Sequence, residues 1–138
     1  MKKPTAVILD LDFTLAHFEG GYERIYETLA PLGLPRYEAK DALQKTVASE
    51  EGFNFQRYIQ IMEAEGLKAN WDDVAKALDQ LFQNAYVFYP DVADFLAAAR
   101  DKGIPLVLVT AGNTEFQQAK IDHLGYTFDD IFITTLPK

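Results

Sequence analysis

Two aspartates follow a short apolar run near the start of the chain. In the stretch TAVILDLDFTL, the apolar residues 6–9 lead directly into Asp10 and Asp12. Side chains alternate along a strand, so both aspartates point the same way if the strand continues, and both approach one site if it curls. Carboxylates this close repel each other unless a cation or a shared proton relieves them. Mg²⁺ can do so, because it binds one or two carboxylates and completes its shell with water and substrate phosphate.

Two adjacent carboxylates of this kind suit phosphoryl transfer. One aspartate can attack phosphorus and form an aspartyl-phosphate, while the other protonates the leaving oxygen. A bound metal would offset charge on the transferring group. The same pair of residues can also simply end a strand and begin a loop.

The surrounding elements predict an α/β fold. Three apolar runs have the character of buried parallel strands: AVILDLD, IPLVLVTAGN and DDIFITT. A helix that stops at Gly103 precedes the second strand. A helix that runs from an N-cap at Thr114 to Gly125 precedes the third strand. Without residues 19–89 the order is strand, helix, strand, helix, strand, which is typical of a right-handed parallel α/β unit.

Residues 19–89 have a helical pattern instead. A segment of this length is too long for a loop, so it predicts a small helical subdomain inserted after the first strand. Asn70 is the expected N-cap of its last helix. Three apolar stripes mark the helices: Tyr22, Ile25, Tyr26 and Leu29; Phe55, Tyr58, Ile59 and Met62; and Val74, Leu78, Leu81, Phe82 and Ala85.

Polar residues stand at the carboxyl end of each expected core strand, where open parallel sheets bind ligands. Asp10 and Asp12 follow the first strand, Thr110 ends the second, and residues 134–138 with Lys138 follow the third. Two carboxylates, a hydroxyl and an ammonium would therefore share one rim. A threonine such as Thr110, taken alone, is more often a satisfied core hydroxyl than a ligand, and Lys138 could equally be a solvated chain end.

These segments resemble the haloacid dehalogenase-like hydrolase superfamily. DLDFT matches its DxDxT motif, VLVTAGN is similar to its second motif, and TTLPK is similar to the stretch that delivers its lysine. The resemblance runs along the whole chain in order. It implies a Rossmann-like, three-layer parallel-sheet core made of residues 1–18 and 90–138, with residues 19–89 as a helical cap.

The resemblance also implies roles for individual residues. Asp10 would be the nucleophile and a Mg²⁺ ligand, and Asp12 the general acid/base, with its backbone carbonyl also on the metal. Thr14 would stabilise the turn, Thr110 would bond a phosphoryl oxygen, and Lys138 would hold the nucleophile and phosphate. Dehalogenases of the superfamily lack an acid at the position of Asp12, so its presence favours phosphoryl chemistry.

The sequence departs from the family pattern in two places. Ala111 follows Thr110 where many members have Asn, so an amide contact to phosphate would come from Asn113 or from the backbone N–H groups of Ala111 and Gly112. The family also continues into a further helix, a fourth strand and an acidic fourth motif. We therefore expect the N-terminal part of a longer hydrolase, or a natural truncation, whose exposed sheet edge invites a homodimer or pairing with another chain.

The composition of the chain disfavours several classes of binding partner. Among 138 residues the formal net charge is −8, which disfavours nucleic acid as a general partner. No segment is long enough to cross a bilayer, so no membrane partner is expected. The chain has no cysteine, which excludes disulfides and fits a cytoplasmic location.

We therefore expect a Mg²⁺-dependent phosphatase that hydrolyses a small-molecule phosphate ester through an aspartyl-phosphate. The alternative is a catalytically incompetent fragment, or a binding or scaffold module, that keeps the fold without a complete metal site. A receiver-like signalling domain also combines aspartates, Thr and Lys on a parallel sheet. Such domains lack a long helical insertion after the first strand and carry the phosphorylated aspartate on a later one.

Overall fold

The chain divides into two compact units. The computed structural model describes residues 5–135; within them, residues up to His17 and from Val87 onward form the first unit, and Phe18–Tyr86 form the second. The expected boundaries lay at residues 18 and 89. Each unit is described separately below.

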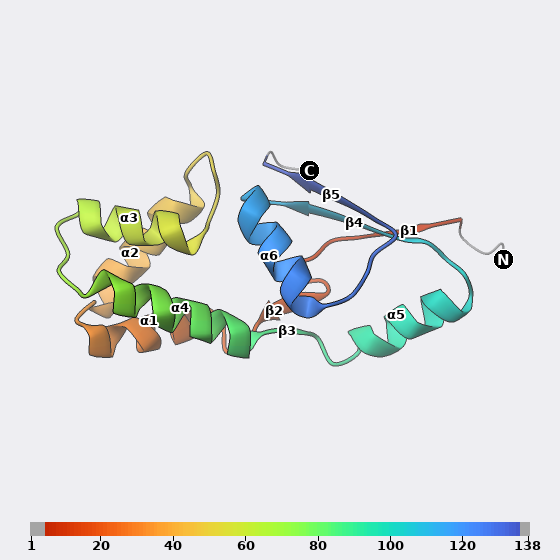
Figure 1. Cartoon of the computed structure of the whole chain (residues 1–138), viewed down its shortest axis with the longest axis horizontal. Coiled ribbons are helices and arrows are strands. Elements are labelled where there is room, and N and C mark those ends of the chain that lie inside the picture. Colours follow the sequence, from red (N-terminus) through yellow and green to blue (C-terminus); the bar gives the residue numbers. More distant parts are fainter. Residues whose placement is uncertain (1–4, 136–138) are drawn as a thin grey trace. The chain divides into compact units, whose positions relative to one another are not determined.

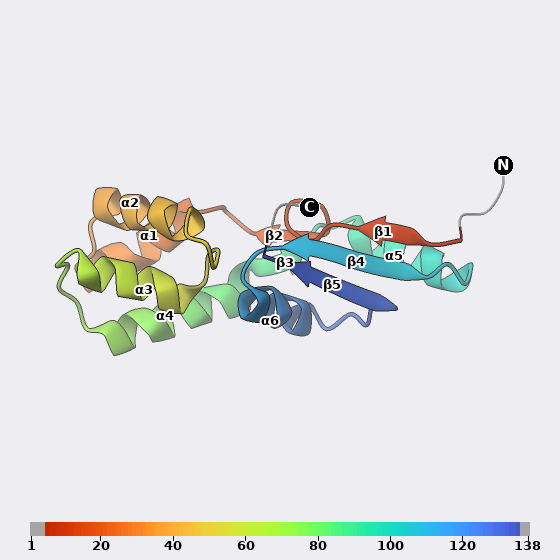
Figure 2. The same ribbon diagram turned by 90° about the horizontal axis from the view of Figure 1, so that it is seen from above.

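A parallel three-stranded sheet forms the centre of the first unit. Strands β1 (Val7–Leu9), β4 (Leu106–Ala111) and β5 (Asp130–Thr134) lie side by side in the order β1-β4-β5 (Figures 1 and 2). Leu9 pairs with Leu108, and Thr110 pairs with Ile133. The carboxyl ends of β1 and β4 therefore meet at the same rim, and the predicted α/β class with a parallel sheet is confirmed.

Two helices cover one face of this sheet. Helices α5 (Val92–Asp101) and α6 (Thr114–Leu124) both lie below the strands in Figure 1. Burial along β4 alternates, with Leu106, Leu108 and Thr110 buried on the covered face. The opposite face is more open, since Ile8 is 71% exposed and Phe132 55% exposed.

The start of α6 differs from the expectation. The N-cap is Asn113, whose side-chain Oδ1 accepts a hydrogen bond from the Phe116 N–H at 3.0 Å. The predicted cap, Thr114, is instead the first helical residue, so that prediction was wrong by one position. Asn and Thr both cap helices well, and sequence alone does not separate neighbours of this kind. The helix ends at Gly125 with a left-handed φ of 72°, as predicted.

The second unit is helical, as its sequence pattern predicted. It contains α1 (Glu23–Leu29), the short 3-10 helix η1 (Ala30–Leu32), α2 (Arg36–Val47), α3 (Phe55–Ala64) and α4 (Trp71–Ala85). Asn70 caps α4 by accepting a hydrogen bond from the Asp73 N–H. The predicted stripes supply most of the core; its buried members from these stripes are Ile25, Tyr26, Leu29, Tyr58, Met62, Val74, Leu78, Leu81 and Ala85.

Two short strands lie where the chain passes between the units. Strands β2 (Ala16–Phe18) and β3 (Tyr86–Phe88) pair with each other in a two-stranded sheet. Each is three residues long, too short for a period-2 pattern to stand out, and the sequence did not predict them.

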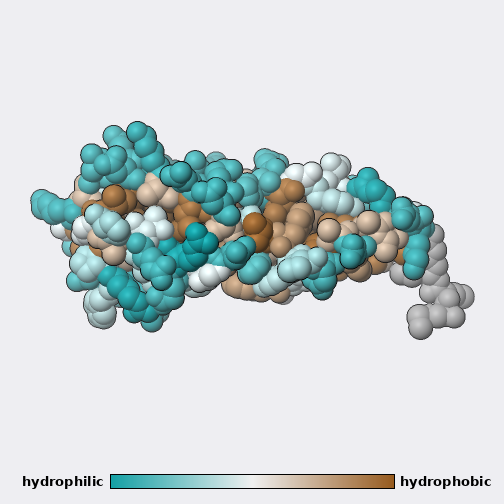
Figure 3. All heavy atoms as spheres, turned by 90° about the horizontal axis from the view of Figure 1, so that it is seen from below, coloured by the Kyte–Doolittle hydropathy of each residue, from teal (hydrophilic) through white to brown (hydrophobic). Residues whose placement is uncertain are grey.

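Hydrophobic side chains also reach the surface. The space-filling view shows brown hydrophobic patches between teal hydrophilic ones (Figure 3). The large hydrophobic residues with exposed side chains include Ile8, Phe13, Tyr22, Tyr37, Val47, Phe95 and Phe132.

Within residues 5–135, no helix is both long enough and apolar enough to cross a bilayer.

A buried tyrosine should make the stability of the second unit depend on alkaline pH. The Tyr58 hydroxyl is buried and donates to the Ala39 carbonyl at 2.7 Å. Burial raises the pKa of Tyr58 above its usual range. Above the ordinary tyrosine pKa of about 10, the unfolded chain loses this proton while the folded chain keeps it. Stability should therefore fall as pH rises past about 10, by at most about 1.4 kcal/mol per pH unit.

Urea unfolding between pH 8 and 11 would measure this effect. We expect Tyr58→Phe to lose about 1 kcal/mol of stability at neutral pH, because its hydrogen bond is gone, and to show a shallower alkaline decline. Tyr37→Phe is the matched control, since Tyr37 is 78% exposed. Equal alkaline slopes in wild type and Tyr58→Phe would contradict the assignment.

Candidate active site

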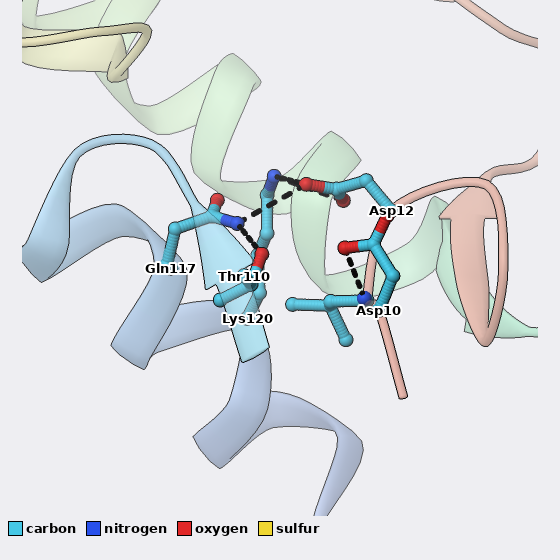
Figure 4. A network of polar contacts seen from close by, with 6 residues as sticks. Asp10, Asp12, Thr110, Gln117 and Lys120 are labelled. Atoms are coloured by element: carbon cyan, nitrogen blue, oxygen red, sulfur yellow. Dashed lines mark hydrogen bonds and ion pairs between the residues drawn. The ribbon is translucent and has the colours of Figure 1, made fainter. Parts of the chain in front are cut away.

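The two aspartates lie on a turn just beyond the first strand. Strand β1 ends at Leu9, and the chain then turns, so that the N–H groups of Leu15 and Ala16 donate to the Leu11 carbonyl at 2.9 and 3.1 Å. Of the two arrangements open from the sequence, the strand curls rather than continues. Figure 4 shows Asp10 and Asp12 at this turn, facing the side chains of β4 and α6.

Asp10 is half-buried at the start of the turn. Its Oδ1 accepts a hydrogen bond from the backbone N–H of Leu11 at 2.8 Å. This local bond fixes how the carboxylate is directed as the chain leaves β1. A carboxylate oriented in this way is a suitable hard-oxygen ligand or nucleophile.

Asp12 is the centre of a polar network. The Lys120 Nζ lies 3.1 Å from its Oδ1 and 3.0 Å from its Oδ2, and the Gln117 Nε2 donates to Oδ2 at 3.2 Å. The Lys120 side chain is 9% exposed and that of Asp12 is 31% exposed. Charge-assisted hydrogen bonds in a partly buried environment are stronger than those between exposed groups, so they restrict the movement of the Asp12 carboxylate.

Thr110 joins the same network from the neighbouring strand. It is buried, and its Oγ1 accepts a hydrogen bond from the Gln117 Nε2 at 2.7 Å. One amide nitrogen therefore links Thr110 on β4 to Asp12 after β1. The predicted gathering of Asp10, Asp12 and Thr110 at one rim matches where the structure places them.

Lys120 is a cation in a poorly solvated position. Burial lowers the pKa of its ammonium, and the Asp12 carboxylate acts in the opposite direction by charge and hydrogen bonding. The ammonium also lies 4.7 Å from the centre of the Phe116 ring. A buried cation is tolerated when an anion and further favourable contacts compensate for lost water, and Asp12 supplies the anion.

The remaining second-motif residues serve local structure. Ala111 ends β4, and the Gly112 N–H donates to the Thr134 carbonyl at 2.8 Å. The Asn113 side chain caps α6. The predicted phosphate-binding roles of Ala111, Gly112 and Asn113 stay predictions, and in this structure the Gly112 N–H and the Asn113 carbonyl oxygen already have protein partners.

The turn itself contains one strained residue. Phe13 has a φ of 61°, in the left-handed region that a residue with a side chain rarely adopts. Thr14 is exposed, and its N–H donates to the Leu11 carbonyl at 3.3 Å, so its backbone helps to close the turn. Lys138, the predicted phosphate-binding lysine, lies outside the described residues.

Comparison with known proteins identifies the family. A family model described as haloacid dehalogenase-like hydrolase matches residues 7–136. The chain belongs to this family. It is therefore a member of a hydrolase family, and the resemblance of its motifs is confirmed at that level.

Solved structures share the fold of this haloacid dehalogenase-like chain at low sequence identity. A Thermotoga maritima protein assigned as a β-phosphoglucomutase is 20% identical, with a TM-score of 0.65, and the match covers 98% of this chain and 63% of that one. A Haemophilus somnus protein predicted to be a phosphoglycolate phosphatase is 19% identical, with a TM-score of 0.50 and coverage of 97% and 64%.

A dehalogenase is also among the similar structures. The L-2-haloacid dehalogenase from Xanthobacter autotrophicus, with chloropropionic acid covalently bound, is 17% identical, with a TM-score of 0.53 and coverage of 94% and 56%. The chain thus spans less than two thirds of the length of these three proteins. No curated protein matches the sequence significantly.

The donor atoms of this haloacid dehalogenase-like site are compatible with Mg²⁺. Within residues 5–135, no group of three or more His, Cys, Asp and Glu side chains comes together that could hold a metal. The Lys120 ammonium contacts the Asp12 carboxylate, so the Asp10 carboxylate is the group at the turn that would hold the ion. This set fits Mg²⁺, because that ion keeps several waters and needs only one or two protein carboxylates.

Sequence reasoning missed Gln117 and Lys120. Both lie on α6, separated by one helical turn, and both are buried although polar. Their spacing of three residues, on a helix that must cover the sheet, is the signal that could have found them. A polar pair on the buried face of a helix needs partners, and the rim of the sheet is where such partners stand.

Proposed function

We propose that this protein is a Mg²⁺-dependent phosphatase that hydrolyses a small phosphomonoester through an aspartyl-phosphate on Asp10. The observation that carries the proposal is the second carboxylate, Asp12, linked through Gln117 to the Thr110 hydroxyl. An ester oxygen needs a proton when it leaves, whereas a halide does not. An acid beside the nucleophile therefore favours phosphate ester hydrolysis over dehalogenation.

The first half-reaction would use both aspartates. An Asp10 carboxylate oxygen forms a bond to phosphorus as the bond between phosphorus and the ester oxygen breaks. The electron pair of that bond goes to the leaving oxygen, which takes a proton from the Asp12 carboxyl group. Lys120 stabilises the Asp12 carboxylate that results, and the Thr110 hydroxyl donates to a phosphoryl oxygen.

The second half-reaction returns the site to its starting state. The Asp12 carboxylate takes a proton from a water molecule whose oxygen bonds to phosphorus. The bond between phosphorus and Asp10 breaks, and inorganic phosphate and the free Asp10 carboxylate are released. When bound, Mg²⁺ would be held by the Asp10 carboxylate and the Asp12 carbonyl, and it would offset negative charge on the phosphoryl group.

A second candidate is a binding or scaffold module that keeps the fold without turnover. It is favoured by one observation: the metal donors that residues 5–135 bring together fall short of three acidic side chains. The two candidates differ in a simple property, since only an enzyme consumes substrate.

Steady-state hydrolysis of an aryl phosphate by this chain tests the proposal. We expect release of the aryl alcohol with Mg²⁺ present, falling to the uncatalysed rate when a chelator removes the metal and returning when Mg²⁺ is restored. Circular dichroism in the chelator would show that the fold persists. A folded sample without Mg²⁺-dependent turnover would support the binding module and contradict the phosphatase.

A further inference from the structure

Helix α6 presents two polar side chains to the site from its buried face. Gln117 is 2% exposed and Lys120 is 7% exposed, although both are strongly polar. Their neighbours Gln118 and Ala119 are exposed. Burying such groups is costly unless they are hydrogen-bonded, and both find their partners in Thr110 and Asp12.

The amide of Gln117 fixes the spacing of two site residues. Its Nε2 lies 2.7 Å from the Thr110 Oγ1 and 3.2 Å from the Asp12 Oδ2. A carboxylate only accepts hydrogen bonds, so the nitrogen and not the oxygen of the amide must face Asp12. Because the Thr110 oxygen accepts from Gln117, the hydroxyl hydrogen of Thr110 can be donated elsewhere. The amide thereby orients Thr110 as a donor.

Lys120 constrains the same carboxylate from another direction. Its ammonium lies almost equally far from the two oxygens of Asp12, at 3.1 and 3.0 Å. A bond to one oxygen would leave the carboxylate able to rotate about it, whereas contact with both opposes that rotation. Figure 4 shows Lys120 and Gln117 reaching Asp12 from α6.

The second motif leaves room for this arrangement. Gly112 has a φ of 147°, and a Cβ built there would lie 3.1 Å from the Gln117 Cδ and 3.2 Å from its Cγ. A side chain at position 112 would therefore crowd the Gln117 side chain, which would have to shift by a few tenths of an ångström. The glycine at position 112 therefore leaves space for the Gln117 side chain in its observed position.

We propose that Gln117 and Lys120 are positioning residues that hold the Asp12 carboxylate and the Thr110 hydroxyl in one fixed arrangement. The inference rests on the proposed function insofar as Asp12 is the acid/base. Both residues act through Asp12 and Thr110: in the proposed chemistry neither forms a bond to phosphorus and neither transfers the proton. When the Asp12 carboxyl group is held at a fixed distance from the Thr110 hydroxyl, which donates to a phosphoryl oxygen, less free energy is needed to reach the transition state.

Crystal structures of two variants test the geometry without any turnover. We expect the Asp12 carboxylate to rotate from its wild-type orientation in Lys120→Met, and the Thr110 hydroxyl and Asp12 to lose their shared partner in Gln117→Leu. If Lys120→Met does not fold, Lys120→Gln keeps a hydrogen-bond donor without the charge and replaces it. An Asp12 carboxylate that keeps its orientation in the lysine and glutamine variants would overturn the proposal.

Leaving-group dependence tests the consequence for chemistry. A nitrophenyl phosphate has a leaving group that needs little protonation, whereas an alkyl phosphate depends on the acid. In both variants we expect kcat for an alkyl phosphate to fall by about 100-fold, with a smaller loss for the nitrophenyl ester and little change in KM. A merely structural role would lower both rates in the same proportion, which would overturn the proposal.

Exposed residues supply matched controls. Lys102→Met and Gln118→Leu make the same chemical changes at exposed positions of the same unit, and both should keep wild-type rates. Wild-type protein without turnover would contradict the proposed function, and the crystal structures would still decide the positioning. Turnover in wild type with unchanged leaving-group dependence in the variants would spare the function and reject the positioning.

Discussion

Asp10→Asn should lower kcat/KM for an aryl phosphate by roughly 10⁴-fold or more, because a carboxamide oxygen is too weak a nucleophile to form the covalent bond to phosphorus. The substitution is nearly isosteric. The new side-chain oxygen can still accept the hydrogen bond that Leu11 now donates to Asp10 at 2.8 Å, so the turn after β1 should keep its shape. The loss would then report on chemistry and not on folding.

Rates, thermal unfolding and mass spectrometry together check this expectation. Rapid acid quenching should trap a phosphorylated peptide containing Asp10 in the wild type, and none in Asp10→Asn. Asp94→Asn, at an exposed position in the same unit, should keep both the rate and the trapped intermediate. Turnover retained in Asp10→Asn with the same metal dependence would remove Asp10 as the nucleophile.

Asp12→Asn should reduce kcat by about 10²- to 10⁴-fold, the usual contribution of a general acid/base. The loss should be larger for an alkyl phosphate than for a nitrophenyl phosphate, since an amide cannot supply the proton that the poorer leaving group requires. An equal loss for both esters would contradict the assignment of Asp12 as the acid.

The same substitution should also destabilise the fold. Lys120, with a side chain 9% exposed, would lose the anion that compensates for its burial. Leaving a buried polar group without a full partner costs about 1–3 kcal/mol, which urea unfolding can resolve. Lys120→Met combined with Asp12→Asn should recover part of that loss, because the double variant buries no unpaired charge.

The sequence predicted the elements whose patterns are long or sharply bounded. The apolar run before Asp10, the run that ends at Thr110 and the stripe along α4 all became the expected strand or helix. The parallel order of the core followed from the alternation of strands and helices. These features depend on local composition and on rules that hold for most folds.

The parts that escaped prediction depend on contacts between distant residues. Gln117 and Lys120 meet Thr110 and Asp12 only because α6 packs across the rim, and their partners lie up to 108 positions away. The choice of Asn113 over Thr114 as cap depends on one hydrogen bond, which the composition of the stretch does not reveal. In each case the deciding quantity is a side-chain geometry and not a sequence pattern.

The cap at Asn113 bears on which sequences selection can accept. Its side chain secures the first turn of α6, one turn before Gln117 and two turns before Lys120. A library randomised at position 113 and selected for turnover should therefore return Ser, Thr and Asp as well as Asn, because all four cap helices well. Ser, Thr and Asp have no side-chain amide that could bind a phosphate. The preference for these residues at position 113 would then reflect helix capping, although it could be misinterpreted as a requirement for substrate binding.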